Sequence, residues 1–316
     1  MSSFSITESA FSGLRLLGRR PLAALVWSAI YIVVFGAIVA LFGGAIVNFV
    51  SAIAQHGGKP DPAAVIGMIG SVGGFYVLLV IGSVVINGVI SCAVYRAELH
   101  PDESRFFYMR FGAAEGWLML VSFVRGLLIF LVQMVFLIPI TIVTVAVAAA
   151  GAAASGHAAG GAAAGAAMLI GGVLRLAMYG VLIWLYLRFS LAGPMTFVDR
   201  QFRLFESWTL TKGQGWRLFA VGLLIGVVGF GLYFILSIVG FAGGFALWGS
   251  FPHPATADAF FSQPPAQIMR VLAPFLEWAV VLLFVGGVVM LPVSLAPWAH
   301  ILRRLKPETD VAKVFE

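Results

Sequence analysis

Six long apolar runs constrain this chain more than any other feature. Each run has at least about 20 residues, which is the length an α-helix needs to cross the hydrocarbon core of a bilayer. A helix also satisfies its own backbone hydrogen bonds, as lipid requires. The sequence therefore predicts an all-α fold, a polytopic transmembrane helical bundle with a single integral membrane domain over residues 1–316. The six predicted spans cover about residues 22–49, 65–94, 117–147, 168–191, 218–247 and 272–299.

The stretch between the fourth and fifth apolar runs, residues 189–218, predicts a membrane exit and re-entry. Gly193 and Pro194 should end the fourth span, because proline cannot continue a helical hydrogen-bond ladder. Residues 197–211 mix aromatic and aliphatic side chains with charged ones, which is typical of an amphipathic helix in the headgroup plane. Gly213 can take left-handed backbone geometry, so we expect that helix to stop and turn there.

Similar charged segments precede the first and third spans. Residues 1–21 combine apolar side chains with Arg15, Arg19 and Arg20, and lack the small-residue cleavage site of a signal peptide. In residues 95–115, Pro101, Asp102 and Glu103 suit the first turn of a helix. We therefore expect interfacial amphipathic helices before spans one, three and five, in three weakly repeated units.

The lysine and arginine residues are distributed very unevenly between the two sets of connecting segments. One set, which includes both termini, holds fifteen of them, whereas the opposite loops hold only Lys59 and Arg270. The positive-inside rule then predicts that both termini are cytoplasmic. It also explains the formal charge of +6 better than nucleic-acid binding does, because the cations flank the spans and form no single basic patch.

Two connections on the opposite side have a biased composition. Residues 148–167 are almost entirely alanine and glycine, which predicts a mobile external connection into which the neighbouring spans can extend as helices. Residues 249–267 are rich in proline and aromatic residues, and predict a loop.

The region around the fourth-to-fifth connection resembles a known family. It has Arg188 and Pro194 at the end of span four, the pair Ser207-Trp208, a turn with Leu210, Thr211 and Gly213, and Trp216-Arg217 at the start of span five. This pattern is similar to the multi-span integral membrane domain attached to some bacterial glycerophosphoryl diester phosphodiesterases, and to free-standing bacterial inner-membrane proteins like it. The resemblance implies a bacterial inner membrane and a link to phospholipid metabolism. The chain lacks the family's soluble phosphodiesterase domain, so hydrolytic activity is not implied.

The same connection supplies the candidate binding residues. Cations near an anionic leaflet attract lipid headgroups, and tryptophan rings fix depth at the interface. We expect anionic phospholipid headgroups as partners; the alternative is that the cations serve topology alone. The candidate lipid-binding residues are Arg188, Arg200, Arg203, Trp208, Lys212, Trp216 and Arg217.

Three charged residues lie furthest inside the predicted spans: Arg125, Arg175 and Glu277. Charge in hydrocarbon is costly, so such side chains pair, face water or extend to the interface. Arg175 and Glu277 both lie near the external ends of their spans, which predicts that they pair.

No pattern in the chain indicates catalysis, a metal or a cofactor. The five histidines are scattered, no phosphate loop or GxSxG motif occurs, and Cys92 is the single cysteine. Three functions are open: phospholipid handling or envelope homeostasis, an assembly or regulatory subunit of a membrane complex that binds a membrane-protein partner or a second copy, and transport of a small solute.

Overall fold

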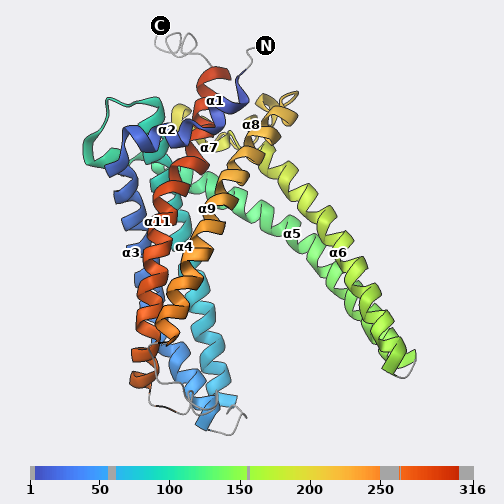
Figure 1. Ribbon diagram of the computed structural model, residues 1–316. Coiled ribbons are helices and arrows are strands. Elements are labelled where there is room, and N and C mark those ends of the chain that lie inside the picture. Colours follow the sequence, from blue (N-terminus) through green and yellow to red (C-terminus); the bar gives the residue numbers. More distant parts are fainter. Residues whose placement is uncertain (1–3, 56–61, 155–156, 250–262, 264, 306–316) are drawn as a thin grey trace. The chain divides into compact units, whose positions relative to one another are not determined.

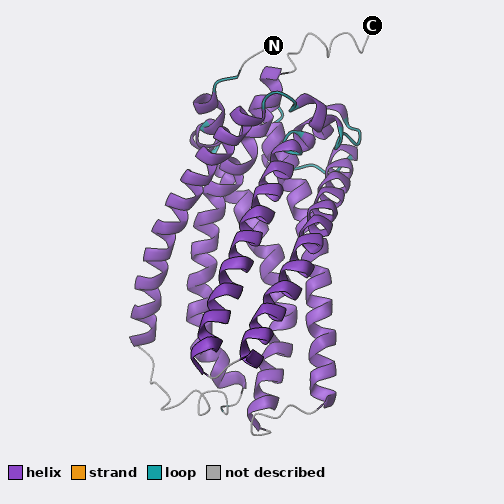
Figure 2. Ribbon diagram, turned by 90° about the vertical axis from the view of Figure 1, so that its right-hand side faces the viewer, coloured by secondary structure: helices purple, strands orange, loops and turns teal. Residues whose placement is uncertain are grey.

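The computed structural model describes residues 4–55, 62–154, 157–249, 263 and 265–305. Within these ranges the regular elements are all helices, with no strand (Figure 2). Six helices are long and apolar enough to cross a membrane, which confirms the predicted all-α, six-span class. They are α3 (Pro21–Gln55), α4 (Pro62–Leu99), α5 (Ala113–Ala154), α6 (His157–Arg188), α9 (Gly215–Gly249) and α11 (Pro265–Leu305), labelled in Figure 1.

These helices extend beyond the predicted spans at most ends. The alanine- and glycine-rich tract is helical on both sides of residues 155–156, because α5 runs to Ala154 and α6 begins at His157. The neighbouring spans therefore extend as helices through this tract wherever it is described, and its mobility stays a prediction. Alanine has the highest helix propensity, which offsets the glycines. Residues 250–262 of the predicted proline-rich loop lie outside the described residues.

The chain divides into two compact units, each described by itself. Unit 1 comprises Met1–Glu115 and Ala220–Glu316, and unit 2 comprises Gly116–Phe219. The single membrane domain expected from the sequence stays a prediction.

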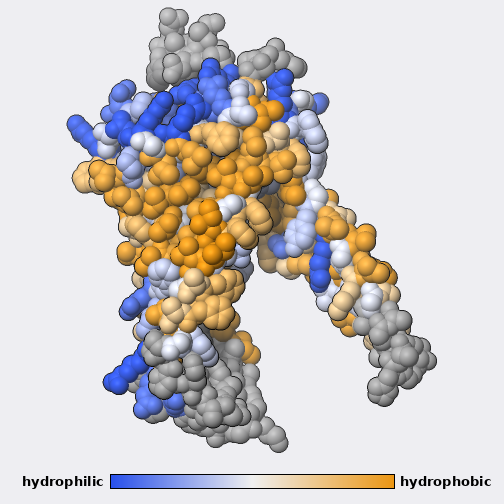
Figure 3. Space-filling model, viewed as in Figure 1, coloured by the Kyte–Doolittle hydropathy of each residue, from blue (hydrophilic) through white to orange (hydrophobic). Residues whose placement is uncertain are grey.

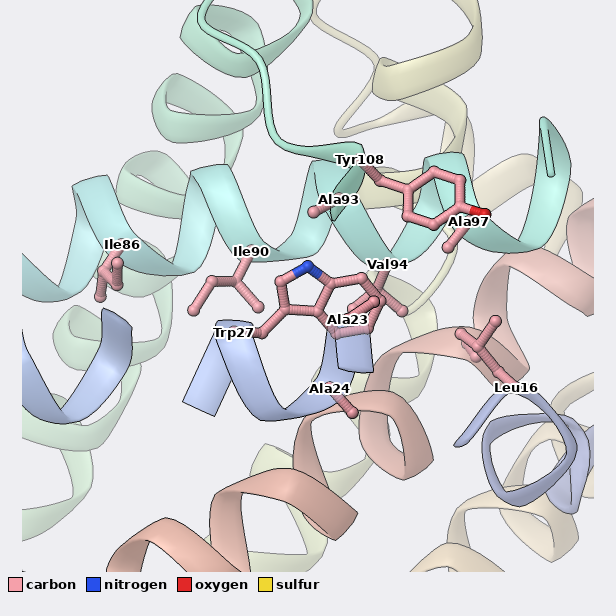
Figure 4. Close-up of a cluster of buried hydrophobic side chains, with 11 residues drawn as sticks. Leu16, Ala23, Ala24, Trp27, Ile86, Ile90, Ala93, Val94, Ala97 and Tyr108 are labelled. Atoms are coloured by element: carbon pink, nitrogen blue, oxygen red, sulfur yellow. The ribbon is translucent and has the colours of Figure 1, made fainter. Parts of the chain in front are cut away.

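In unit 1, α3, α4 and α11 pack together around Trp27. The indole of Trp27 is fully buried and lies between α3 and α4, against Ile90 and Val94 (Figure 4). Its Nε1 donates a hydrogen bond to the carbonyl of Phe107 at 2.9 Å, so a buried donor is satisfied by a loop 80 residues away.

Two short helices, α1 (Ile6–Ala10) and α2 (Ser12–Arg19), precede α3 and lie at one end of unit 1 (Figure 1). Helix α2 buries Gly13 and Leu16, while Arg15 and Arg19 are exposed. Gly13 touches α11 so closely that an added Cβ would lie 2.8 Å from the carbonyl carbon of Pro292. Glycine is required there, because any side chain would push the two helices apart.

The helix expected before the third span is absent from the described residues, which corrects that prediction. Instead, one short turn, η1 (Arg105–Tyr108), contains Phe106, Phe107 and Tyr108 at positive φ. The side chains of Trp27 and Arg96 donate to the carbonyls of Phe107 and Tyr108. These contacts hold the loop in a non-helical form, because they capture carbonyls that a helix would use internally.

In unit 2, α5 and α6 lie side by side (Figure 1). The methyl group of Thr144 on α5 sits against Gly171 on α6, where no side chain intervenes. Figure 3 shows the hydrophobic side chains along the long helices, and the hydrophilic ones gathered over α1 and α2. This distribution suits helices that cross a membrane and helices that lie outside its hydrocarbon core.

Candidate functional site

The connection between α6 and α9 consists of two short helices in place of the single helix predicted for residues 197–211. These are α7 (Ala192–Asp199) and α8 (Glu206–Leu210). Helix α7 ends at Asp199, and the residue that follows, Arg200, has a left-handed φ of 50°. The amide of Arg203 donates to the hydroxyl of Thr196 at 3.3 Å, whereas a continuous helix would bond it to the carbonyl of Asp199. This competing bond explains why the helix is interrupted.

Of two other expectations for this connection, the break at Gly193 and Pro194 is wrong and the turn at Gly213 is confirmed. Helix α6 ends at Arg188, and Gly193 and Pro194 lie in the first turn of α7, where proline is tolerated. Gly213 has a φ of +80° and follows α8, as a turn at that glycine requires. The connection is held in unit 2 by a cluster of Val121, Phe189, Ala192 and Leu204, against which Trp208 packs.

Arg188, the last residue of α6, lies against two tryptophan rings. Its guanidinium carbon is 5.8 Å from the ring centre of Trp184 and 5.6 Å from that of Trp208, both within cation–π range. The two rings meet edge to face at 4.9 Å, and the hydroxyl of Ser207 donates to the carbonyl of Arg188 at 2.8 Å. Both sides of the connection thus fix the position of this arginine.

The charge of Arg188 is not neutralised by any described carboxylate. No described acidic side chain lies within ion-pair distance of it, and its Nη1 atom is buried without a hydrogen-bond partner. A buried donor without a partner costs about 1–3 kcal/mol. Such an atom is a place where a ligand can bind with a gain in free energy.

An apolar cavity of about 330 Å³ opens beside Arg188. Of the described residues that line it, Arg188 alone carries a charge, and the others are mostly aliphatic and aromatic. Trp216 lies at its edge with 81% of its surface exposed, stacked on Phe219 at 5.3 Å. The lining residues are Gly180, Ile183, Trp184, Leu187, Arg188, Thr211, Gly215, Trp216, Leu218 and Phe219.

The seven candidate lipid-binding residues differ in their relation to the cavity. Arg188, Trp208 and Trp216 come together at this cavity, either in its wall or against Arg188. Arg200, Lys212 and Arg217 are exposed and line no part of it.

Arg203 is occupied by two carboxylates. Its guanidinium lies 3.2 Å from Asp199 and 2.9 Å from Glu206. The hydrogen bond with Glu206, followed by the charge of Asp199, raises the pKa of Arg203 and outweighs partial desolvation. The same hydrogen bond lowers the pKa of the Glu206 carboxyl. Arg203 therefore stabilises the connection. Its charge is already neutralised by two carboxylates, so it attracts a lipid headgroup only weakly.

Three residues that line the cavity, Trp184, Ile183 and Phe219, were not predicted from the sequence. Two of them could have been predicted from their spacing along a helix. Trp184 is four residues before Arg188, and Phe219 is three residues after Trp216, so each pair shares a helix face. Ile183 had no such signal, because an apolar span contains many equivalent residues.

The three charged residues of the spans lie on different helices. Arg125 on α5 is half-buried, while Arg175 on α6 and Glu277 on α11 are exposed. Arg175 belongs to unit 2 and Glu277 to unit 1, so their pairing stays a prediction. Within the part of the chain that the structure describes, no group of three or more His, Cys, Asp or Glu side chains could hold a metal ion.

The fold and the site define a multi-pass membrane protein with an apolar, arginine-capped cavity. Comparisons with protein-family models, with curated proteins and with solved structures found no match. The resemblance to the membrane domain of glycerophosphoryl diester phosphodiesterases therefore remains an expectation from the sequence.

Proposed function

We propose that this chain is a bacterial inner-membrane protein with both termini in the cytoplasm, which handles phospholipid without catalysing a reaction. In this proposal an anionic phospholipid places its phosphate against Arg188 and one acyl chain along the cavity. The observation that carries the proposal is the guanidinium of Arg188, which has no ion pair with any described residue and lies beside a pair of touching tryptophan rings at the edge of an apolar cavity.

The chemistry of the site suits a phosphate diester. Arginine presents its N–H groups in a planar fork that matches two phosphate oxygens. The tryptophan rings lie within cation–π distance of the guanidinium, and this contact does not use its N–H groups in hydrogen bonds. The unpartnered Nη1 would gain a charge-assisted hydrogen bond when the phosphate binds.

The cavity suits a hydrocarbon chain. Its volume of about 330 Å³ is at the lower end for a small-molecule site, and its wall is apolar apart from Arg188. That size accommodates part of one acyl chain. Trp208 and Trp216 are the amphipathic residues that prefer the level of the headgroups, and the uneven distribution of cations supports a cytoplasmic location for this end.

Retention of phosphatidylglycerol by the purified protein tests the headgroup contact. Substituting Arg188 with glutamine removes a charge-assisted contact worth about 1.5–3 kcal/mol, so we expect phosphatidylglycerol bound in native mass spectra to fall at least about tenfold. Arg200→Gln is the matched control, because it removes an equivalent exposed charge from the same connection; its effect should stay within about twofold. Equal retention by the Arg188→Gln variant and the unaltered protein would reject this site.

A second pair of variants tests the acyl-chain contact. Gly180 lines the cavity and has no atom within 4 Å of an added Cβ, so Gly180→Phe should fill the cavity without strain in α6. Gly172→Phe is the control on the same helix, where an added Cβ also meets nothing. Loss of lipid in the first variant alone supports the cavity as the acyl site, and equal binding by both variants and the unaltered protein contradicts it.

A further inference from the structure

A second cavity lies in unit 1, among α1, α2 and the C-terminal ends of α4 and α11. It has a volume of about 190 Å³, and its wall is charged. Four arginines and two glutamates line it together with His300, so positive charge exceeds negative charge by two before the histidine is counted. Figure 3 shows hydrophilic residues gathered over α1 and α2, at this end of unit 1.

Three of the four arginines already contact the glutamates. Arg304 donates to Glu8 at 2.9 Å, and Arg15 lies 4.0 Å from the same carboxylate. Arg303 lies 3.6 Å from Glu98. These contacts hold the walls of the cavity together, because they join α1 to α11 and α4 to α11.

Arg19 is the exception among the arginines. Its side chain has neither a hydrogen bond nor an ion pair with any other described residue. It also lines an adjoining cavity of about 310 Å³, which shares Leu16, Glu98 and Arg303 with the first. Arg19 therefore stands between the two spaces with its charge unused.

His300 provides a second unused group. Its side chain is only 5% exposed, and its Nδ1 lies 3.0 Å from the Glu98 carboxylate. Its Nε2 is buried without a hydrogen-bond partner and lies 3.8 Å from Glu8, beyond hydrogen-bond distance. Among the described residues, the cavity wall thus contains a guanidinium without an ion pair and a buried ring nitrogen without a hydrogen bond.

We infer that this charged cavity binds a phosphate group, with Arg19 and His300 as the residues that contact it. The excess of positive charge selects an anion, and guanidinium groups match phosphate oxygens. A volume of about 190 Å³ is below that of a typical small-molecule site, so it admits a phosphate with a small substituent. In this inference the rest of the ligand lies in the adjoining cavity of about 310 Å³. This inference is independent of the proposed lipid site at Arg188, which lies in the other unit.

The phosphate could belong to a soluble phosphate ester or to a lipid headgroup, and two probes distinguish these sources. The soluble probe is glycerol 3-phosphate, titrated calorimetrically into the full chain in phosphatidylcholine nanodiscs. The membrane probe is phosphatidylglycerol, counted by native mass spectrometry. Both use the Arg188→Gln background, so that the site proposed above does not contribute.

Arg19→Gln should weaken binding of at least one probe about tenfold, which is the effect of one charge-assisted hydrogen bond. Arg105→Gln is the matched control, an exposed arginine of unit 1 that lines neither cavity. His300→Gln is the second variant, and should also weaken binding. A loss with glycerol 3-phosphate alone identifies a soluble ligand, and a loss with phosphatidylglycerol alone identifies a headgroup. The inference is overturned if neither probe binds, or if Arg19→Gln and Arg105→Gln have equal effects.

Discussion

The guanidinium of Arg96 and the carboxylate of Glu115 meet at 2.6 Å with side chains only 7% and 3% exposed. Removing the Glu115 carboxylate leaves the buried guanidinium with the Tyr108 carbonyl and the more distant carboxylate of Glu103, at 3.8 Å. Breaking a buried pair in this way costs about 3–5 kcal/mol. We therefore expect Glu115→Gln to lower the melting temperature of the purified protein strongly. Replacing both residues with methionine should recover much of the loss, because no unpaired charge then remains buried.

A neighbouring pair provides the control for this prediction. Arg110 and Glu103 lie 2.9 Å apart, but both side chains are nearly half exposed. Solvent screens such a pair, so Arg110→Gln should cost less than about 1 kcal/mol. A melting temperature for Glu115→Gln no lower than that of Arg110→Gln would contradict the assigned importance of the buried pair.

The contact between α2 and α11 predicts opposite effects for two glycines on one helix. A methyl group at Gly13 collides with the backbone of Pro292 and Val293, whereas one at Gly18 meets nothing within 4 Å. Gly13→Ala should destabilise the docked α2 by about 1–3 kcal/mol, as overpacking does. Gly18→Ala should be neutral or stabilise the helix by up to about 1 kcal/mol. Hydrogen exchange of residues 12–19 measures both, and equal protection in the two variants would show that α2 does not pack on α11 as described.

The attachment of α1 should depend on pH. The hydrogen bond from Arg304, helped by the charges of Arg304, His300 and Arg15, holds the pKa of Glu8 below its ordinary value of 4.5. Because the pKa is lower in the folded state, the contact stabilises the fold above pH 4.5, and this stabilisation is lost as the pH falls through the folded pKa. The difference in melting temperature between the unaltered protein and Glu8→Gln should therefore be present near neutral pH and shrink in acid. A difference that is constant with pH would argue against the contact.

Cysteine labelling tests the predicted topology. Cys92 is fully buried, so it should contribute little background. A cysteine at Ser155 should react with a membrane-impermeant reagent in intact cells, and one at Asp310 only after the membrane is opened; both positions lie outside the described residues. Labelling of the Asp310 cysteine in intact cells would reject a cytoplasmic C-terminus.

The spans could be predicted from sequence because a long apolar run has one stable conformation in lipid. The form of the segments before α5 and α9 could not be predicted, because side-chain hydrogen bonds outside the helical register decide it. The loop carbonyl of Phe107 is bonded by Trp27, and the amide of Arg203 by Thr196. Neither bond leaves a trace in the local pattern of apolar and charged residues.

The candidate site was partly predictable for a related reason. Aromatic and basic residues near a span end are conspicuous in sequence, which singled out Arg188, Trp208 and Trp216. The sequence does not show which of these cations are neutralised. The structure distinguishes Arg203, which is bound by two carboxylates, from Arg188, which lies beside two tryptophan rings. The charged cavity of unit 1 was missed because Arg19 and His300 are separated by most of the chain and become neighbours only through folding.

The close contact of Gly13 with Pro292 also bears on how the protein is made. A ribosome produces α2 first among these two helices and α11 much later, so the buried face of α2 has no partner during most of translation. Leu16 lies on that face, and the hydrophobic core in which it is buried includes Ala296 of α11. That core is therefore incomplete until α11 has been synthesised. Docking of α2 therefore marks the completion of unit 1, and a chain stopped before α11 would display this segment to the proteases and chaperones that survey unfinished membrane proteins.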